Sequence, residues 1–285
     1  EVKDFAFIEG NGGAVFVQDG TATLNGGTIQ NCIDLSKKSG VGDGGGAIYV
    51  NGGDFVMYGG TIQKCDGHNG GAVLVKGGNV IIDGSNSNDD NKPYIYNNTA
   101  RDGGGVMSWG STSKITIKDA TISKNSSNGS GGGTYAHSGS IIEMYENVII
   151  SENTAGGNGG GAASSGTVTI SGSTIKQNTA GSYGGGLYAN ATITFNDGVV
   201  QNNTSKYGGG ASVNNGNLNM TNGIITSNTS SLYGGGIYVN KGNFTMINGE
   251  ISYNTSGNEN STTGMGGAIY IENGNFTMMD GEVAN

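Results

Sequence analysis

A six-residue glycine motif that recurs ten times constrains this sequence more than any other feature. The copy Gly234-Gly235-Gly236-Ile237-Tyr238-Val239 shows its form: two glycines, a small residue, an aliphatic residue, a variable residue, and usually Val or Ala. The other copies begin at Gly12, Gly45, Gly70, Gly103, Gly131, Gly159, Gly184, Gly208 and Gly266. Successive copies start 24 to 33 residues apart. A period of this size is typical of a repeat array in which each unit stacks on the next.

Two further runs follow each glycine motif in a fixed order. The first alternates apolar and polar residues, as in Asn243-Phe244-Thr245-Met246, and predicts a strand with one buried side. The second ends in an aliphatic residue, two spacers and an Asn that precedes Ser or Thr. These are Asn98, Asn125, Asn153, Asn178, Asn203, Asn228 and Asn254. Three short strands in each repeat predict an all-β parallel β-helix solenoid of about ten rungs.

Stacked rungs place equivalent residues about 4.8 Å apart, so the seven Asn residues are expected to form a ladder. Asn tolerates left-handed backbone angles at a tight turn, and stacked Asn side chains can hydrogen-bond above and below. In the first two rungs this position is held by Cys32 and Cys65, the only cysteines. Their predicted spacing suits a disulfide, and two buried thiols that replace Asn are the alternative. Both interpretations remain open at this point.

The variable residue of the glycine motif lies between two core residues and is predicted to face water. Its aromatic copies are Phe16, Tyr49, Tyr135, Tyr188, Tyr238 and Tyr270. A second set, Tyr183, Tyr207 and Tyr233, precedes three successive motifs and extends this column. The simpler interpretation is a stacked ladder that shields the sheet. The alternative is a contact stripe for a glycan, another protein or a second copy of the rod, because exposed apolar patches mark interaction surfaces.

The repeats run from Gly12 to Asp280 without a linker, so residues 1–285 are expected to form a single elongated domain. Residues 1–11 are predicted to be a partial rung or cap. The polar residues 85–93 are predicted to leave the rod as a loop insertion at a turn. Both ends of the sequence look cut from a longer chain.

Charge and hydropathy argue against two classes of partner. The net charge is −9 and Arg101 is the only arginine, so nucleic acid is a poor candidate, because phosphate binding requires dense Lys and Arg. No run of 18 apolar residues occurs, so no transmembrane segment is predicted.

No catalytic, cofactor or metal site is predicted, and the chain is expected not to be an enzyme. Asp89-Asp90 is the only paired acid, and a solvated acidic loop is favoured there over a weak calcium site. His68 and His137 lie in separate rungs without an acid or Cys spaced as a partner. The glycine motif is not a phosphate-binding loop, because no helix and no Gly-Lys-Ser/Thr follow it.

The repeat sequences also resemble known surface proteins. Gly45-Gly46-Ala47-Ile48, together with the spacing from Ile175 to Asn178, resembles the repeats of the polymorphic outer-membrane proteins, with Ile or Val where that family has Phe. The run Gly242 to Met246 is similar to right-handed β-helix repeats of adhesin-like surface proteins from gut Firmicutes and methanogenic archaea. The resemblance covers nearly the whole chain. It implies a right-handed β-helix in an adhesin stalk that is secreted or displayed on the cell surface, and it brings no catalytic residues.

Three functional hypotheses follow. The leading one is a non-enzymatic, extracellular or cell-surface rod that attaches to a glycan or a surface protein. The second is a structural filament subunit whose copies stack end to end through open strand edges. The third, a carbohydrate-active enzyme of the pectin-lyase-like type, requires acidic side chains that converge on one groove.

Overall fold

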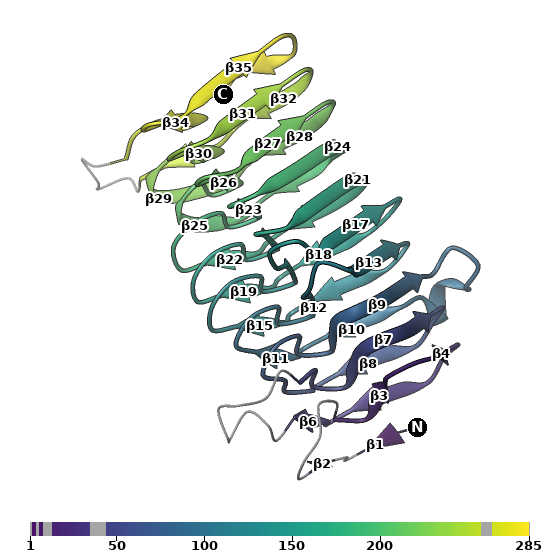
Figure 1. Cartoon of the computed structure of the whole chain (residues 1–285). Coiled ribbons are helices and arrows are strands. Elements are labelled where there is room, and N and C mark those ends of the chain that lie inside the picture. The colour runs from purple at the N-terminus through teal and green to yellow at the C-terminus, as the bar shows by residue number, and fades with distance from the viewer. Residues whose placement is uncertain (1, 4–5, 8–12, 35–43, 258–263, 285) are drawn as a thin grey trace.

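A computed structural model describes residues 2–3, 6–7, 13–34, 44–257 and 264–284. The chain winds as a right-handed parallel β-helix whose turns stack along one axis (Figure 1). This confirms the predicted fold class. The solenoid has about eight turns, fewer than the ten predicted rungs. Each of the ten glycine motifs nevertheless contributes a strand to the first row described below, and Gly12 itself lies outside the described residues.

Four rows of strands run along the axis, and every described strand pair is parallel. The first row contains the three-residue strands of the glycine motif. It consists of β3 (Val15–Val17), the start of β7 (Ile48–Met57), the start of β9 (Val73–Asp83), β12 (Val106–Ser108), β16 (Thr134–Ala136), β20 (Ala162–Ser164), β23 (Leu187–Ala189), β26 (Ala211–Val213), β30 (Ile237–Val239) and β34 (Ile269–Ile271).

The second row contains the alternating runs that follow. It consists of β4 (Thr21–Leu24), the ends of β7 and β9, β13 (Ser113–Lys118), β17 (Ile141–Tyr145), the start of β21 (Thr167–Lys176), the start of β24 (Thr192–Gln201), β27 (Asn217–Met220), β31 (Asn243–Met246) and β35 (Asn275–Met278).

The third row leads into the ladder Asn. It consists of β1 (Val2–Lys3), β5 (Thr28–Gln30), β8 (Thr61–Gln63), β10 (Tyr94–Tyr96), β14 (Thr121–Ser123), β18 (Ile149–Ser151), the ends of β21 and β24, β28 (Gly223–Thr226), β32 (Gly249–Ser252) and β36 (Glu282–Val283). Val2 pairs with Ile29, so the first described residues continue the third row below the first turn.

A fourth row of very short strands was not predicted, and it follows the ladder Asn along the left side of Figure 1. It consists of β2 (Ala6–Phe7), β6 (Ile33–Asp34), β11 (Thr99–Ala100), β15 (Ser126–Ser127), β19 (Thr154–Ala155), β22 (Thr179–Ala180), β25 (Thr204–Tyr207), β29 (Thr229–Tyr233) and β33 (Thr255–Ser256). Seven of these nine strands have only two residues and carry no periodicity, which is why the sequence pattern indicated only three strands per turn.

The interior is a continuous column of apolar side chains from the first three rows. In the second turn Ile48, Val50, Phe55, Met57 and Ile62 are all buried in it, and their equivalents repeat this arrangement from turn to turn. The alternation of strands such as β13, with buried and half-buried residues in turn, places one side of each strand in this core.

The corner between the third and fourth rows is formed by a residue with left-handed backbone. Lys64, Asn97, Lys124, Glu152, Gln177, Asn202, Ser227 and Tyr253 have φ angles between 52° and 57°. Each of them directly precedes a ladder position, so the prediction that the ladder Asn itself is left-handed was wrong. Because the chain turns one residue earlier, the Asn side chain points inward and is buried.

Within the described ranges no helix is long and apolar enough to cross a membrane. The one helical segment described in them is η1 (Asp89–Asn91), a single 3-10 turn.

Candidate functional site

The ladder Asn residues form a buried column of hydrogen-bonded amides from Asn98 to Asn254. Asn178 shows the pattern. Its Nδ2 donates to Ile150 O and to Asn203 Oδ1, both at 3.0 Å. Its Oδ1 accepts from the backbone N of Asn153 at 2.9 Å and from Nδ2 of Asn153 at 3.0 Å. Both donors and both lone pairs of the amide are therefore satisfied without water.

The two cysteines continue this column into the first turns. They occupy equivalent positions, because Gln30 pairs with Gln63 and Ile33 pairs with Asp66. Cys65 N donates to Asn98 Oδ1 at 2.9 Å, so its backbone takes part in the ladder although its side chain is not an amide. Both cysteines are buried and present as thiols. A hydrogen bond with Cys32 and burial raise the pKa of Cys65. A disulfide between them remains a prediction for oxidising surroundings.

The predicted water-facing column on the first row is mostly covered. Phe16 is 47% exposed, but Tyr49, Tyr188 and Tyr238 are only 3%, 8% and 3% exposed, and Tyr135 and Tyr270 are half-buried. The expected exposure of the contact stripe was therefore wrong for most of its members. Tyr49 is buried in a cluster with Leu74 and Met107, against which Trp109 and Tyr135 pack. Tyr238 is covered by Tyr183 and Tyr207, which precede their glycine motifs.

The C-terminal part of this cover is a tyrosine cluster, formed by Tyr183, Tyr188, Tyr207, Tyr233, Tyr238 and Tyr270. The ring centroids of Tyr183 and Tyr207 lie 4.8 Å apart and those of Tyr233 and Tyr270 lie 4.7 Å apart, with nearly parallel planes. Tyr207 and Tyr183 also pack against Tyr238, with centroids at 5.3 Å and 5.9 Å. Burial, and next the hydrogen bond of its hydroxyl to Glu272, raise the pKa of Tyr238.

Stacking limits what the tyrosine cluster can bind. A ring that packs against rings on the turns above and below presents its edge and hydroxyl to solvent, and little of its face. The cluster therefore favours the simpler of the two interpretations, a ladder that shields the first row and holds neighbouring turns together.

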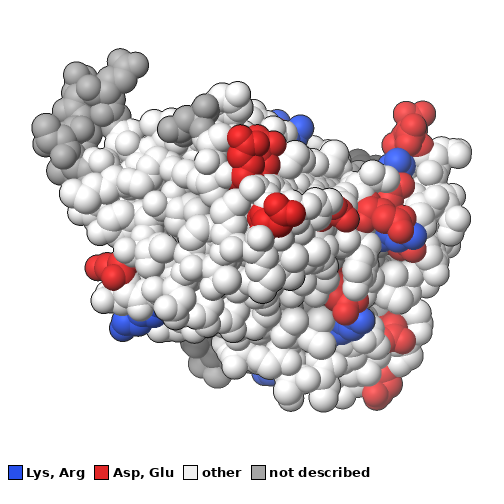
Figure 2. Space-filling model, turned by 90° about the horizontal axis from the view of Figure 1, so that it is seen from above, with Lys and Arg blue, Asp and Glu red and all other residues white. Residues whose placement is uncertain are grey.

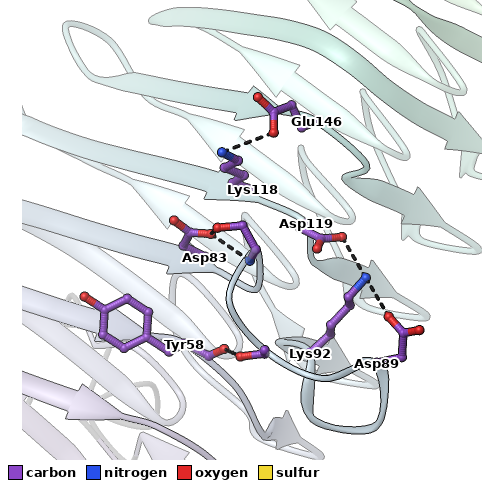
Figure 3. A network of polar contacts seen from close by, with 9 residues as sticks. Tyr58, Asp83, Asp89, Lys92, Lys118, Asp119 and Glu146 are labelled. Carbon is purple, nitrogen blue, oxygen red and sulfur yellow. Dashed lines mark hydrogen bonds and ion pairs between the residues drawn. The ribbon is translucent and has the colours of Figure 1, made fainter.

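The loop insertion is tied to the rod by ion pairs and hydrogen bonds (Figure 3). Lys92 Nζ lies 2.9 Å from Asp89 Oδ1 and 3.1 Å from Asp119 Oδ1, and these two acids raise the pKa of Lys92. Ser87 donates to the backbone oxygen of Tyr58. Lys92 thus partly neutralises the acidic loop, which argues against a calcium site built on Asp89 and Asp90.

Among the residues that the structure describes, no three His, Cys, Asp or Glu side chains form a cluster that could hold a metal ion. His137 stacks on Trp109 with ring centroids 4.8 Å apart, so its ring takes part in packing. On the face shown in Figure 2 charged side chains are sparse, and acidic atoms cover more of the surface than basic ones.

A groove of 660 Å³ runs along the corner between the second and third rows, and we call it the corner groove. It crosses four turns of the C-terminal part of the rod. Gly198, Gly223, Gly249 and Gly281 form its floor, one from each turn. A Cβ on Gly249 would lie 2.3 Å from Gly223 O, so the close stacking of the turns leaves no room for a side chain there.

The two walls of the corner groove differ in chemistry. One wall is a column in strict register, with Val199 beside Ile224, Ile224 beside Glu250, and Glu250 beside Glu282. On the opposite side Asn222 Nδ2 donates to Asp197 Oδ1 at 2.6 Å. In the described part of the chain no Lys or Arg forms an ion pair with Asp197, Glu250 or Glu282. The groove thus combines two apolar side chains, Val199 and Ile224, with three carboxylates, Asp197, Glu250 and Glu282.

Sequence reasoning missed the corner groove because its acids are 85 residues apart along the chain, from Asp197 to Glu282. A signal was nevertheless present. Glu250 and Glu282 each follow a turn glycine at the same place in the repeat, and Asp197 precedes one. Aligning the repeats on these glycines, in addition to the glycine motif, would have placed the three carboxylates along one corner.

Comparisons of the chain with protein-family models, with curated proteins and with solved structures found no match.

Proposed function

We propose that this chain is a non-enzymatic rod of the adhesin type, extracellular or displayed at the cell surface, that attaches to a glycan or a surface protein. The observation that carries the proposal is the corner groove, which extends across four turns and offers both apolar and polar contacts. A ligand-binding surface on a stacked scaffold is already ordered, so little conformational entropy is lost on binding. The resemblance of the repeats to adhesin-like surface proteins supports the proposed location.

Binding of the purified chain to a panel of glycans and to microbial and host cell surfaces tests this proposal. We expect saturable binding that falls when Ile224→Arg replaces an exposed apolar side chain of the groove with a long charged one. The matched control is Ile81→Arg, which changes an exposed isoleucine of the second row outside the groove. Failure to bind any member of the panel, or equal loss of binding in the control, would overturn the proposal.

A carbohydrate-active enzyme is the second candidate, because Asp197, Glu250 and Glu282 line one groove. Glycoside hydrolysis commonly uses two carboxylates on opposite sides of the scissile bond. Incubation with polysaccharides separates the candidates: new reducing ends, lost in Glu250→Gln and Glu282→Gln, would establish the enzyme. Binding without any change in polymer length supports the adhesive rod.

The filament hypothesis has no observation of its own in its favour. In the last turn β34, β35 and β36 each pair on one side only. Further turns of the same chain and a second copy of the rod would cover that edge equally well.

A further inference from the structure

The direction of the corner groove restricts the shape of its ligand. The groove lies across the strands and along the axis, and the backbone groups of its floor already bond from turn to turn, as Gly223 and Gly249 do in their paired strands. A ligand therefore cannot add to the sheet as an extra strand. It has to lie along the axis and meet the side chains of successive turns.

The register of the wall restricts the repeat of the ligand. Val199, Ile224, Glu250 and Glu282 are direct neighbours in successive turns, so one wall residue occurs about every 4.8 Å. A pyranose residue in a linear β-linked glycan advances by nearly this length, and each sugar ring would meet one turn. An extended peptide presents side chains on one side about every 6.6–6.8 Å and falls out of register after a single turn.

The chemistry of the wall restricts the ligand further. Val199 is half-buried and Ile224 is 38% exposed, and both suit the apolar C–H face of a sugar ring. Glu250 and Glu282 place two like charges side by side, an arrangement that destabilises a sheet pair. Asp197 adds a third acid at the opposite side. Cations held at these acids would offset the repulsion and complement the charge of the groove.

We infer that the corner groove binds a linear glycan with free amino groups, its sugar rings following the axis and its ammonium groups paired with Glu250, Glu282 and Asp197. This inference rests on the proposed function and adds to it the chemical class of the ligand.

Calorimetric titration of the full chain tests the inference with three probes of matched length at mildly acidic pH: a β-linked glucosamine tetramer, its N-acetylated form, and tetralysine. The glucosamine tetramer is expected to bind, with an affinity that falls from 50 to 200 mM salt. Acetylation removes the charge and is expected to weaken binding on the order of tenfold, since each exposed ion pair contributes modestly. Tetralysine is expected to bind more weakly than the glucosamine tetramer.

Two variants locate the site. Glu250→Gln together with Glu282→Gln is expected to weaken binding of the glucosamine tetramer by about tenfold. The control Glu146→Gln together with Glu152→Gln removes the same two charges at exposed residues outside the groove, and it is expected to have no effect. Both changes are nearly isosteric on the surface, so folding should be retained.

The outcomes separate this inference from the proposed function. Equal binding of the acetylated tetramer, tighter binding of tetralysine, or equal loss in the control variant overturns the inference. Binding of other glycans or of cell surfaces without binding of the glucosamine tetramer overturns the inference and leaves the proposed function standing. If the chain binds nothing in either experiment, both fall.

Discussion

The buried Asn ladder predicts a large and local loss of stability when one amide is removed. In Asn178→Ala the backbone N–H of Asn153 loses its acceptor, one hydrogen of the Asn153 amide loses its partner, and Ile150 O loses a donor. Asn203 is less affected, because its Oδ1 still accepts from the backbone N of residue 178 at 2.9 Å.

The magnitude follows from the burial of these groups. Asn153 and Asn178 have no exposed surface, so water does not replace the lost partners without opening the turn. A buried polar group left unpaired costs about 1–3 kcal/mol. With one backbone group and two weaker losses, we expect Asn178→Ala to reduce the free energy of unfolding by about 3–5 kcal/mol.

A matched control exists on the surface of the same rod. Asn243 Nδ2 donates to Asn217 Oδ1 at 2.8 Å, and its own Oδ1 accepts from Asn275 at 3.0 Å, in an exposed amide stack. Water can replace these bonds, so Asn243→Ala is expected to change the free energy of unfolding by no more than about 0.5 kcal/mol.

Urea unfolding followed by circular dichroism measures the total loss, and hydrogen exchange with mass spectrometry locates it. Because each turn contacts only its neighbours, exchange should accelerate in peptides around residues 150–154 and 175–179, on the order of a hundredfold for about 3 kcal/mol, and remain unchanged near the ends. Equal losses in the two variants, or a loss below about 1 kcal/mol in Asn178→Ala, would refute the argument that burial sets the value of these bonds.

Three further predictions concern the backbone and the thiols. Gly160→Ala places a Cβ 2.5 Å from both Gly185 O and Thr179 O, so it should lower the free energy of unfolding by about 3 kcal/mol in urea titration. Tyr253→Gly removes a side chain from a residue with φ of 52° and should raise the free energy of unfolding by about 0.5–1 kcal/mol; a decrease would contradict the strain argument. Under reducing conditions the pKa of Cys65 is raised in the folded state, so the folded thiol stays protonated at a pH where the thiol of the unfolded chain, with its ordinary pKa of 9.0, ionises. The free energy of unfolding should therefore fall as the pH rises past 9.0. Cys65→Ser should make this fall with pH less steep.

The repeat arrangement could be predicted because periodicity is a property of the sequence itself. The spacing of the glycine motifs indicated stacked turns, and the equivalent positions of Asn178, Asn203 and Asn228 indicated one column. Both follow from the rule that residues at the same place in successive turns lie side by side. The apolar core followed from the same rule applied to alternating residues.

Features outside the rows of strands could not be predicted in the same way. The burial of Tyr49 and Tyr238 depends on side chains outside the alternating runs, such as Trp109 against the cluster of Tyr49 and Tyr207 against Tyr238, and the alternation does not predict these contacts. The left-handed corner is filled by residues as different as Lys64, Glu152 and Tyr253, so no residue preference marked it. The corner groove results from the shape of a corner and from distant acids, and neither is visible in a local motif.

The loop of residues 85–93 shows how such a rod can change during evolution. On its far side Tyr94 pairs with Thr61 of the turn before and with Thr121 of the turn after, as though the additional residues were absent. A gene that gains codons at a corner therefore yields a longer loop and an otherwise identical architecture. New recognition chemistry can be acquired there by insertion, one corner at a time, while the turns that carry it keep their pairing.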